Sequence, residues 1–185
     1  MYICTINNRN SNIMRIRVFF ITLVLLLGIT DSFAQKIKKR EIDKFTKSEI
    51  IETSTESLYS VNLLGTGWCE KFDFQIRRIN GEYVMPANIL RQEMVKYQAG
   101  DGVTFLLDNG ETIDLTSNYT GVGGSPFGNG YYFETSFNIP AEAVEKLKKH
   151  KVTDVRIRYM GGHYDRELKA KKQGLIMNML KLLEE

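Results

Sequence analysis

Glycine-containing turn signals separate short stretches of this chain in which apolar and polar residues alternate. Alternation of period two is typical of strands with one buried face, and a glycine turn between two such strands is typical of a hairpin. Three stretches fit this pattern: residues 71–87, 102–116 and 152–168. The sequence therefore predicts an α+β fold that is mainly β, with antiparallel hairpins forming a sandwich or a curled sheet.

The first hairpin turns at Asn80-Gly81, a pair that suits the two left-handed positions of a type I′ turn. This turn predicts three cross-strand pairs: Arg78 with Tyr83, Ile76 with Met85, and Phe74 with Ala87. The apolar members then share one face, which we expect to be buried. Pro86 lacks an N–H group, so the second strand is expected at a sheet edge or at a bulge.

The second hairpin turns through Asp108-Asn109-Gly110. A two-residue turn would place two acidic residues opposite each other, which is repulsive. A three-residue loop with a left-handed glycine instead places Phe105 opposite Ile113 and Val103 opposite Leu115. We expect this second register because it gathers the apolar residues on one face.

The third hairpin offers Gly161-Gly162 as its turn. That register pairs the following residues: Tyr159 with Tyr164, Arg158 with Asp165, Arg156 with Glu167, and Val155 with Leu168. His163, Asp165 and Glu167 share the other face, and such a set resembles the ligands of a metal ion. Because two arginines lie opposite the two carboxylates, we interpret the set as ion-paired instead.

Two helices are expected. Pro140 suits a first helical turn, and residues 141–149 follow with charged residues spaced for ion pairs, Glu142 with Lys146 and Glu145 with Lys149. Residues 169–183 place apolar side chains at helical spacing, so a C-terminal helix is expected to pack on the sheet. Lysines in its first turns oppose the helix dipole, so the helix is expected to begin nearer Gln173.

The first 34 residues are organised like a secretory signal peptide. Arg15 and Arg17 precede a 12-residue apolar run, and Ser32-Phe33-Ala34 ends the segment. Small residues at its first and last positions predict cleavage after Ala34, and an uncleaved anchor is the alternative. We therefore expect a periplasmic or secreted protein that meets the membrane only through this segment, before cleavage.

The rest of the chain divides at residue 45. Residues 35–44 are charged and are expected to form a flexible leader, whereas residues 45–185 are expected to form a single β-rich domain. At the other end, Met14 is an alternative start, in which case residues 1–13 are a gene-start artefact.

Charge and cysteine content narrow the function classes. The chain has a formal net charge of +3, but three arginines and one aspartate lie in the first 34 residues, so the remainder carries +1. This balance gives no basis for nucleic-acid binding. Lys169, Lys171 and Lys172 either face an acidic partner or form a solvated charge run, which is the commoner case. Cys69 has no second cysteine after residue 34, so it is either free or paired between chains.

Residues 116–137 (TSNYTGVGGSPFGNGYYFETSF) are rich in glycine and aromatic residues. Three catalytic motifs fail here at a required position: Asn129 replaces the lysine of a P-loop, Pro126 the third glycine of a dinucleotide fingerprint, and Phe127 the last glycine of a nucleophile elbow. We therefore expect no cofactor and no catalytic residue here.

Four aromatic residues of this stretch are candidate partner-binding residues: Tyr119, Phe127, Tyr131 and Tyr132. Aromatic rings on glycine-rich loops can stack on sugars or insert into protein partners. The alternative is that they fold back and close the core, and strand alternation from residue 131 sends at least one ring inward.

Several segments occur in the same order in a group of uncharacterised exported proteins of Bacteroidetes-type Gram-negative bacteria, which this chain resembles. The segments are DKFTKSEIIETSTESLY, GDGVTFLLDNGETIDL, the glycine-rich stretch leading to YYFETSF, and IPAEAVEKLKKHKVTDVRIRYMGGHYDRELKAK. The resemblance covers nearly all of residues 41–170 and brings no catalytic residues with it. It implies a periplasmic or secreted β-rich domain of unknown function.

No acid–base, metal or nucleophile set emerges from these patterns. We therefore expect a non-enzymatic envelope module that binds a protein or glycan partner. Two alternatives stay open: a small periplasmic hydrolase whose carboxylates are brought together by the fold, and a structural accessory subunit that docks through Met177, Met179 and Leu183.

Overall fold

The computed structural model describes residues 35–63, 68–91, 96–97, 100–118, 121–122, 125–127 and 130–185. Residues 35–185 form one compact unit, and the interpretation of the first 34 residues as a signal peptide lies outside the described residues. Among the described helices, none has the length and apolar content that a membrane span requires.

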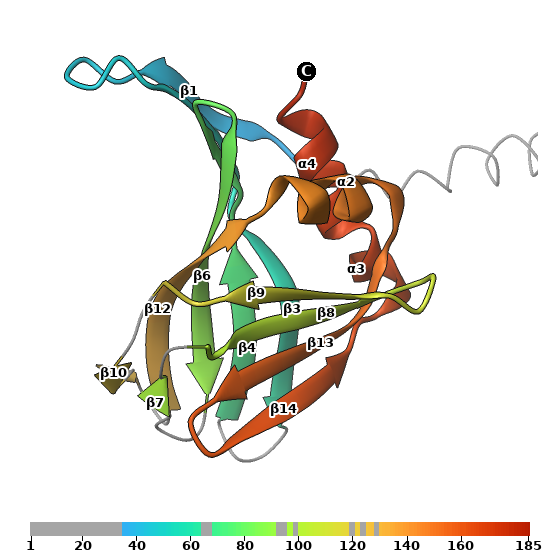
Figure 1. The fold of residues 1–185 in the computed structure, drawn as a ribbon. Helices are drawn as coiled ribbons and strands as arrows, with labels where there is room; N and C mark the ends of the chain where they lie inside the picture. Colours follow the sequence, from blue (N-terminus) through green and yellow to red (C-terminus); the bar gives the residue numbers. More distant parts are fainter. Residues whose placement is uncertain are drawn as a thin grey trace, which may run out of the picture. The chain divides into compact units, whose positions relative to one another are not determined.

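A large antiparallel sheet forms one layer of the fold. Its path is β1-β2-β5-β6-β12-β11, and β4 pairs with both β6 and β3 (Figure 1). The strands are β1 (Ile37–Ile42), β2 (Glu49–Thr53), β3 (Glu56–Leu63), β4 (Trp68–Phe74), β5 (Arg77–Ile79), β6 (Glu82–Arg91), β11 (Ser125–Phe127) and β12 (Gly130–Ile139). Because β4 and β5 both pair with β6, one long strand organises the whole sheet.

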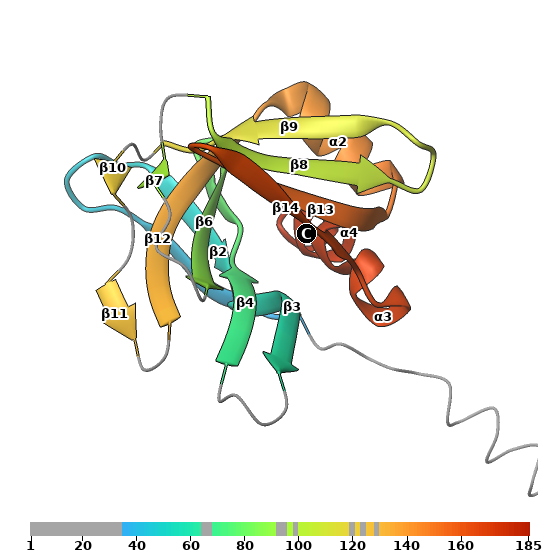
Figure 2. The ribbon, with the colours of Figure 1, turned by 90° about the horizontal axis from the view of Figure 1, so that it is seen from below.

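A four-stranded antiparallel sheet faces the large one (Figure 2). Its order is β14-β13-β8-β9, with β8 (Gly102–Leu107), β9 (Thr112–Thr116), β13 (Val152–Tyr159) and β14 (Gly162–Glu167). A separate two-stranded ladder joins β7 (Lys96–Tyr97) and β10 (Gly121–Val122). The fold is therefore mainly β and antiparallel, as the alternation of the sequence predicts.

The inner faces of the two sheets meet in the hydrophobic core. The large sheet contributes Phe72, Phe74, Met85, Ile89 and Phe137, and the smaller sheet contributes Val103, Phe105, Leu115 and Ile157. All of these side chains are at most 1% exposed. Complete burial stabilises the folded state by about 1.5–3 kcal/mol for each large apolar side chain, before conformational entropy is counted.

The two sheets are joined along the edge between β9 and β12. Ser117 forms a bridge to Phe137, and the Asn118 N–H donates to the Ser136 carbonyl at 2.8 Å. The Ser117 and Thr135 hydroxyls lie 2.6 Å apart in the same buried place. This edge is therefore closed by backbone as well as side-chain hydrogen bonds.

Three helices follow the predicted segments: α2 (Ala141–Lys149), α3 (Ala170–Gln173) and α4 (Leu175–Leu182). The C-terminal helix does pack on the core, but Gly174 interrupts it and α4 starts after that residue. The predicted Glu142–Lys146 pair forms at 3.3 Å, whereas Glu145 contacts Lys148 and not the expected lysine one residue later.

The docking stripe predicted for a structural accessory subunit is wrong. Met179 and Leu183 are fully buried in the hydrophobic core, and α4 packs against α2. Met177, the third member, is half-buried.

Two predicted hairpins have the expected register. Asn80 and Gly81 have φ angles of 49° and 89°, and Phe74 lies opposite Ala87. In the second hairpin Gly110 has a φ of 84°, and the ladder pairs Phe105 with Ile113 and Val103 with Leu115.

Pro86 was expected at a sheet edge or at a bulge, and the sheet-edge alternative is wrong. Pro86 occupies the middle of β6, where the strand has β12 on one side and β4 and β5 on the other. The Gln75 N–H donates to the Pro86 carbonyl at 3.1 Å, and proline has no N–H to return a second bond. The neighbouring strand breaks at this point into β4 and β5, so the interruption accommodates the proline.

The predicted register of the third hairpin is wrong by two residues. The turn is Met160-Gly161, with Gly161 at a φ of 92°, and Gly162 pairs with Tyr159 inside the ladder. A single left-handed residue at the second turn position is the requirement of a type II turn, which one glycine satisfies. A shift of two residues keeps every side chain on its predicted face.

Residues 35–44 do not form the flexible leader that the sequence predicts. They contain β1, which pairs with β2, and Ile37 packs against the core. The Lys38 ammonium lies 3.1 Å from the buried Glu52 carboxylate. The high charge of this segment suits a sheet edge whose side chains are mostly exposed.

Candidate functional site

The two sheets also approach each other at β3 and β14, but no backbone ladder joins these two strands. In the described part of the chain, β3 pairs with β4 alone and β14 pairs with β13 alone. A groove of about 340 Å³ lies here, and we call it the basic groove. Its lining residues are Ser57, Leu58, Tyr59, Ser60, Val61, Arg166, Glu167, Lys169, Lys171 and Lys172. Four of them are cationic and one is anionic, so the groove attracts negative charge.

One wall of the basic groove is the strand β3 itself. Leu58 and Tyr59 are buried, whereas Val61 is 36% exposed. Five consecutive β3 residues line the groove, which corresponds to about 17 Å of extended chain. An unpaired strand edge of this length presents backbone donors and acceptors to a further strand.

Behind the groove lies a group of polar side chains that we call the inner cluster. Its members are Tyr59, Glu70, Arg91, Tyr131, Tyr159, Tyr164 and Arg166, and they come from β3, β4, β6, β12, β13 and β14. The Tyr59 and Tyr164 hydroxyls are 3.0 Å apart, and Arg166 donates to the Glu70 carboxylate. These side-chain contacts connect the large sheet to the smaller one where no backbone ladder of the described strands does.

Arg91 is the most buried cation of the inner cluster. Its residue is 8% exposed, and its guanidinium lies 3.7 Å from the ring centre of Tyr164 and 5.3 Å from that of Tyr159. A cation above an aromatic face is attracted by the negative face of the ring. Nε and Nη1 of Arg91 are nevertheless buried without a hydrogen-bond partner among the described residues.

The tyrosines of the inner cluster are held in their neutral form. Burial raises the pKa of Tyr59 above its usual range, and burial together with the adjacent Tyr59 raises the pKa of Tyr164 as well. Neither phenol can therefore supply a negative charge to the two arginines near neutral pH.

The sequence carries one signal for this cluster, the placement of charged residues at inward positions of the strands. Glu70, Arg91 and Arg166 are each in phase with the inward residues of their strands, for example Arg91 with Met85, Ala87 and Ile89. Charged residues at inward positions of period-two strands mark a polar site in a core. The guanidinium of Arg166 lies 5.5 Å from the Tyr164 ring centre.

The structure separates the four predicted partner-binding aromatics. Tyr131 is half-buried, packs against the core and lies opposite Arg91, so this ring points inward. Tyr132 is half-buried and follows on the other face of β12. Tyr119 and the side chain of Phe127 lie outside the described residues, so their predicted role stays a prediction.

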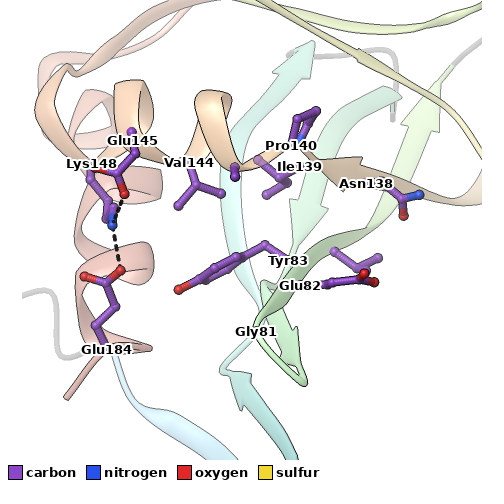
Figure 3. Close-up of a pocket in the computed structure, with 12 residues that line it drawn as sticks. Gly81, Glu82, Tyr83, Asn138, Ile139, Pro140, Val144, Glu145, Lys148 and Glu184 are labelled. Atoms are coloured by element: carbon purple, nitrogen blue, oxygen red, sulfur yellow. Dashed lines mark hydrogen bonds and ion pairs between the residues drawn. The ribbon is translucent and has the colours of Figure 1, made fainter.

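A second cavity, of about 530 Å³, lies between the β5–β6 turn, the end of β12 and α2 (Figure 3). Tyr83 extends beneath α2 towards Lys148 and Glu184. The Lys148 ammonium lies 2.5 Å from Glu145 and 2.6 Å from Glu184, and these hydrogen bonds raise its pKa. Because the lysine stays protonated and paired, it fastens α2 to residue 184 and is unsuited to act as a base.

The predicted face of His163, Asp165 and Glu167 is dominated by an ion pair. Arg156 donates to both oxygens of Asp165 at 2.7 Å, and these hydrogen bonds lower the pKa of that carboxyl. The predicted partner of Asp165 was Arg158, which instead lies 3.5 Å from Asp114. Within the described residues, no group of three or more His, Cys, Asp or Glu side chains is arranged to hold a metal ion.

Cys69 was interpreted as free or paired between chains. Its thiol is free, half-buried and 3.8 Å from the Ser60 hydroxyl on the neighbouring strand.

Comparison of the chain with models of protein families, with curated proteins and with solved structures finds no match. The function of the site is therefore inferred from its own geometry.

Proposed function

We propose that this protein is an exported, non-enzymatic binding module that captures an extended acidic segment of a partner protein in the basic groove. The signal-like first 34 residues support export to the periplasm or the exterior. The observation that carries the binding proposal is an unpaired strand edge facing four cationic side chains.

The shape of the groove favours an extended peptide. Strand addition to an exposed edge provides affinity through backbone hydrogen bonds, while pockets for alternate side chains provide specificity. The lining stretch Ser57–Val61 fits a segment of about five residues. Val61, which is partly exposed, offers an apolar contact to one side chain of such a segment.

The charge of the groove selects an acidic occupant. Arg166, Lys169 and Lys171 line the groove, and Glu167 is the single acid in the lining. Complementary charge speeds association and disfavours basic partners. A neutral glycan would use exposed aromatic rings, whereas the one tyrosine that lines this groove, Tyr59, is buried.

The test uses a fluorescent peptide of about six residues that alternates glutamate and valine, with a lysine–valine peptide as the negative control. Anisotropy should show saturable binding of the acidic peptide that weakens as salt rises. The double variant Lys169→Glu with Lys171→Glu should weaken binding by about tenfold or more.

The matched control carries the same change of charge away from the groove, as Lys36→Glu with Lys44→Glu, because both residues are exposed near β1. Equal weakening by both double variants would show a non-specific charge effect and would overturn the proposal. Binding of heparin in place of the acidic peptide would assign the groove to an anionic glycan instead.

A protective role for the lysines is the main competing explanation. Charged residues beside an edge strand prevent pairing between copies of a protein. If that is their only role, Lys169→Gln with Lys171→Gln should cause self-association, and the acidic peptide should not bind the unaltered protein.

A further inference from the structure

We infer that Arg91 forms a binding site for a small oxyanion, a carboxylate or a phosphate group, inside the inner cluster. This inference is independent of the proposed peptide groove. Arg91 ends β6 at the lower end of the view in Figure 1, where β12 begins and the β13–β14 hairpin turns.

The charges of the inner cluster do not balance. Arg91 and Arg166 contribute two guanidinium groups, and Glu70 contributes one carboxylate. Glu70 is bonded to Arg166, and Arg91 forms no ion pair within the described residues. Arginine remains charged at every accessible pH, so this buried charge cannot be relieved by proton loss.

The inner cluster also contains hydrogen-bond donors that have no acceptor among the described residues. Nε and Nη1 of Arg91 are buried and have no described partner. The Tyr59–Tyr164 contact uses one hydroxyl hydrogen and leaves the other phenol with a hydrogen to donate. A guanidinium group only donates hydrogen bonds, and a neutral phenol readily donates one. These donors therefore suit an oxyanion.

A comparison within the molecule shows what a satisfied buried charge looks like. Glu52 is 6% exposed, and its carboxylate lies 3.1 Å from the Lys38 ammonium and 2.7 Å from Arg77 Nε. Arg91 is buried to a similar degree, and among the described residues it contacts the ring faces of Tyr159 and Tyr164 without forming an ion pair. Because buried charges are normally paired, the missing partner of Arg91 is best supplied by a ligand.

Thermal unfolding at constant ionic strength tests this inference. Phosphate and acetate are each titrated against chloride, and the unaltered protein should be stabilised by at least one of the two oxyanions. A hundredfold excess over the dissociation constant should raise Tm by roughly 5–10 °C. A response to phosphate alone would support a phosphate site, and a response to acetate alone would support a carboxylate site.

The variant Arg91→Met removes the charge and keeps much of the side-chain volume. It should abolish the oxyanion response and should unfold no earlier than the unaltered protein in chloride. Arg40→Met is the matched control, since Arg40 is exposed on β1 and its loss should leave the response unchanged. If Arg91→Met does not fold, Arg91→Lys keeps the charge and should weaken binding about tenfold.

Two results would overturn the inference. One is an unaltered protein that phosphate and acetate stabilise no more than chloride does. That result would indicate that ordered water, and not an oxyanion, binds the unpaired nitrogens of Arg91. The other is an equal response in the Arg91 variant. The groove variant Lys169→Glu with Lys171→Glu should retain the oxyanion response, so the peptide proposal and this inference fail separately.

Discussion

The two edges at which the sheets approach each other are built in different ways. At the β9–β12 edge, a backbone hydrogen bond and a buried hydroxyl pair join the sheets around Ser117 and Asn118. At the β3–β14 edge, the described contacts between the sheets are made by side chains, Tyr59 with Tyr164 and Arg166 with Glu70. The first edge is joined by backbone as well as side-chain hydrogen bonds. The second edge has no backbone ladder between the described strands of the two sheets, and cationic side chains line the groove there.

The largest expected effect is at the closed edge. Phe137 is fully buried beside the bridge to Ser117, so Phe137→Ala should reduce the free energy of unfolding by about 3–5 kcal/mol, through lost burial and a cavity. Urea unfolding followed by circular dichroism measures this change. Phe45→Ala is the control, because Phe45 is 95% exposed and its loss should cost under about 0.5 kcal/mol. Similar costs at both positions would contradict the assigned core.

The next effect is at the open edge. Glu70→Gln removes the partner of Arg166 and adds a second unpaired cation to the inner cluster, so it should cost about 1–3 kcal/mol in the same urea experiment. The double variant Glu70→Leu with Arg166→Met removes both charges and should recover most of that loss. If the double variant is as unstable as the single one, packing at these positions matters more than charge.

The smallest effect concerns the outer face of β14. Arg156 lowers the folded-state pKa of Asp165, so the ion pair stabilises the protein above the unfolded carboxyl pKa of about 4 and is lost as pH falls through the lower folded value. Urea midpoints at neutral and strongly acidic pH should therefore differ slightly less in Arg156→Gln than in the unaltered protein, and the change should be small because solvent screens this exposed pair. A larger acid sensitivity in the variant would reverse the assigned sign.

Local turn chemistry explains which hairpins the sequence could predict. Asn80-Gly81 and Gly110 each permit one good placement of their left-handed residues, so the registers follow from nearby residues. Gly161-Gly162 permits two placements that keep the same faces, and only the packing of the whole strand selects between them.

The site was harder to predict because its members are far apart in the sequence. Tyr59 and Tyr164 meet only when β3 and β14 approach from different sheets, which no local pattern specifies. The inward phase of Glu70 and Arg91 is visible in the sequence. Only the fold shows that Glu70 pairs with Arg166 and that Arg91 has no ion-pair partner among the described residues. The three lysines after β14 were recognised as a basic group, and the fold adds the strand edge beside them.

Backbone hydrogen exchange with and without the acidic peptide tests the contrast between the two edges most directly. If the basic groove binds an extended segment, exchange should slow in β3, Glu56–Leu63, and stay unchanged in β12, Gly130–Ile139. Unchanged exchange in β3 at saturating peptide, with slowing near Tyr83 and Val144 in the other cavity, would contradict the proposed groove.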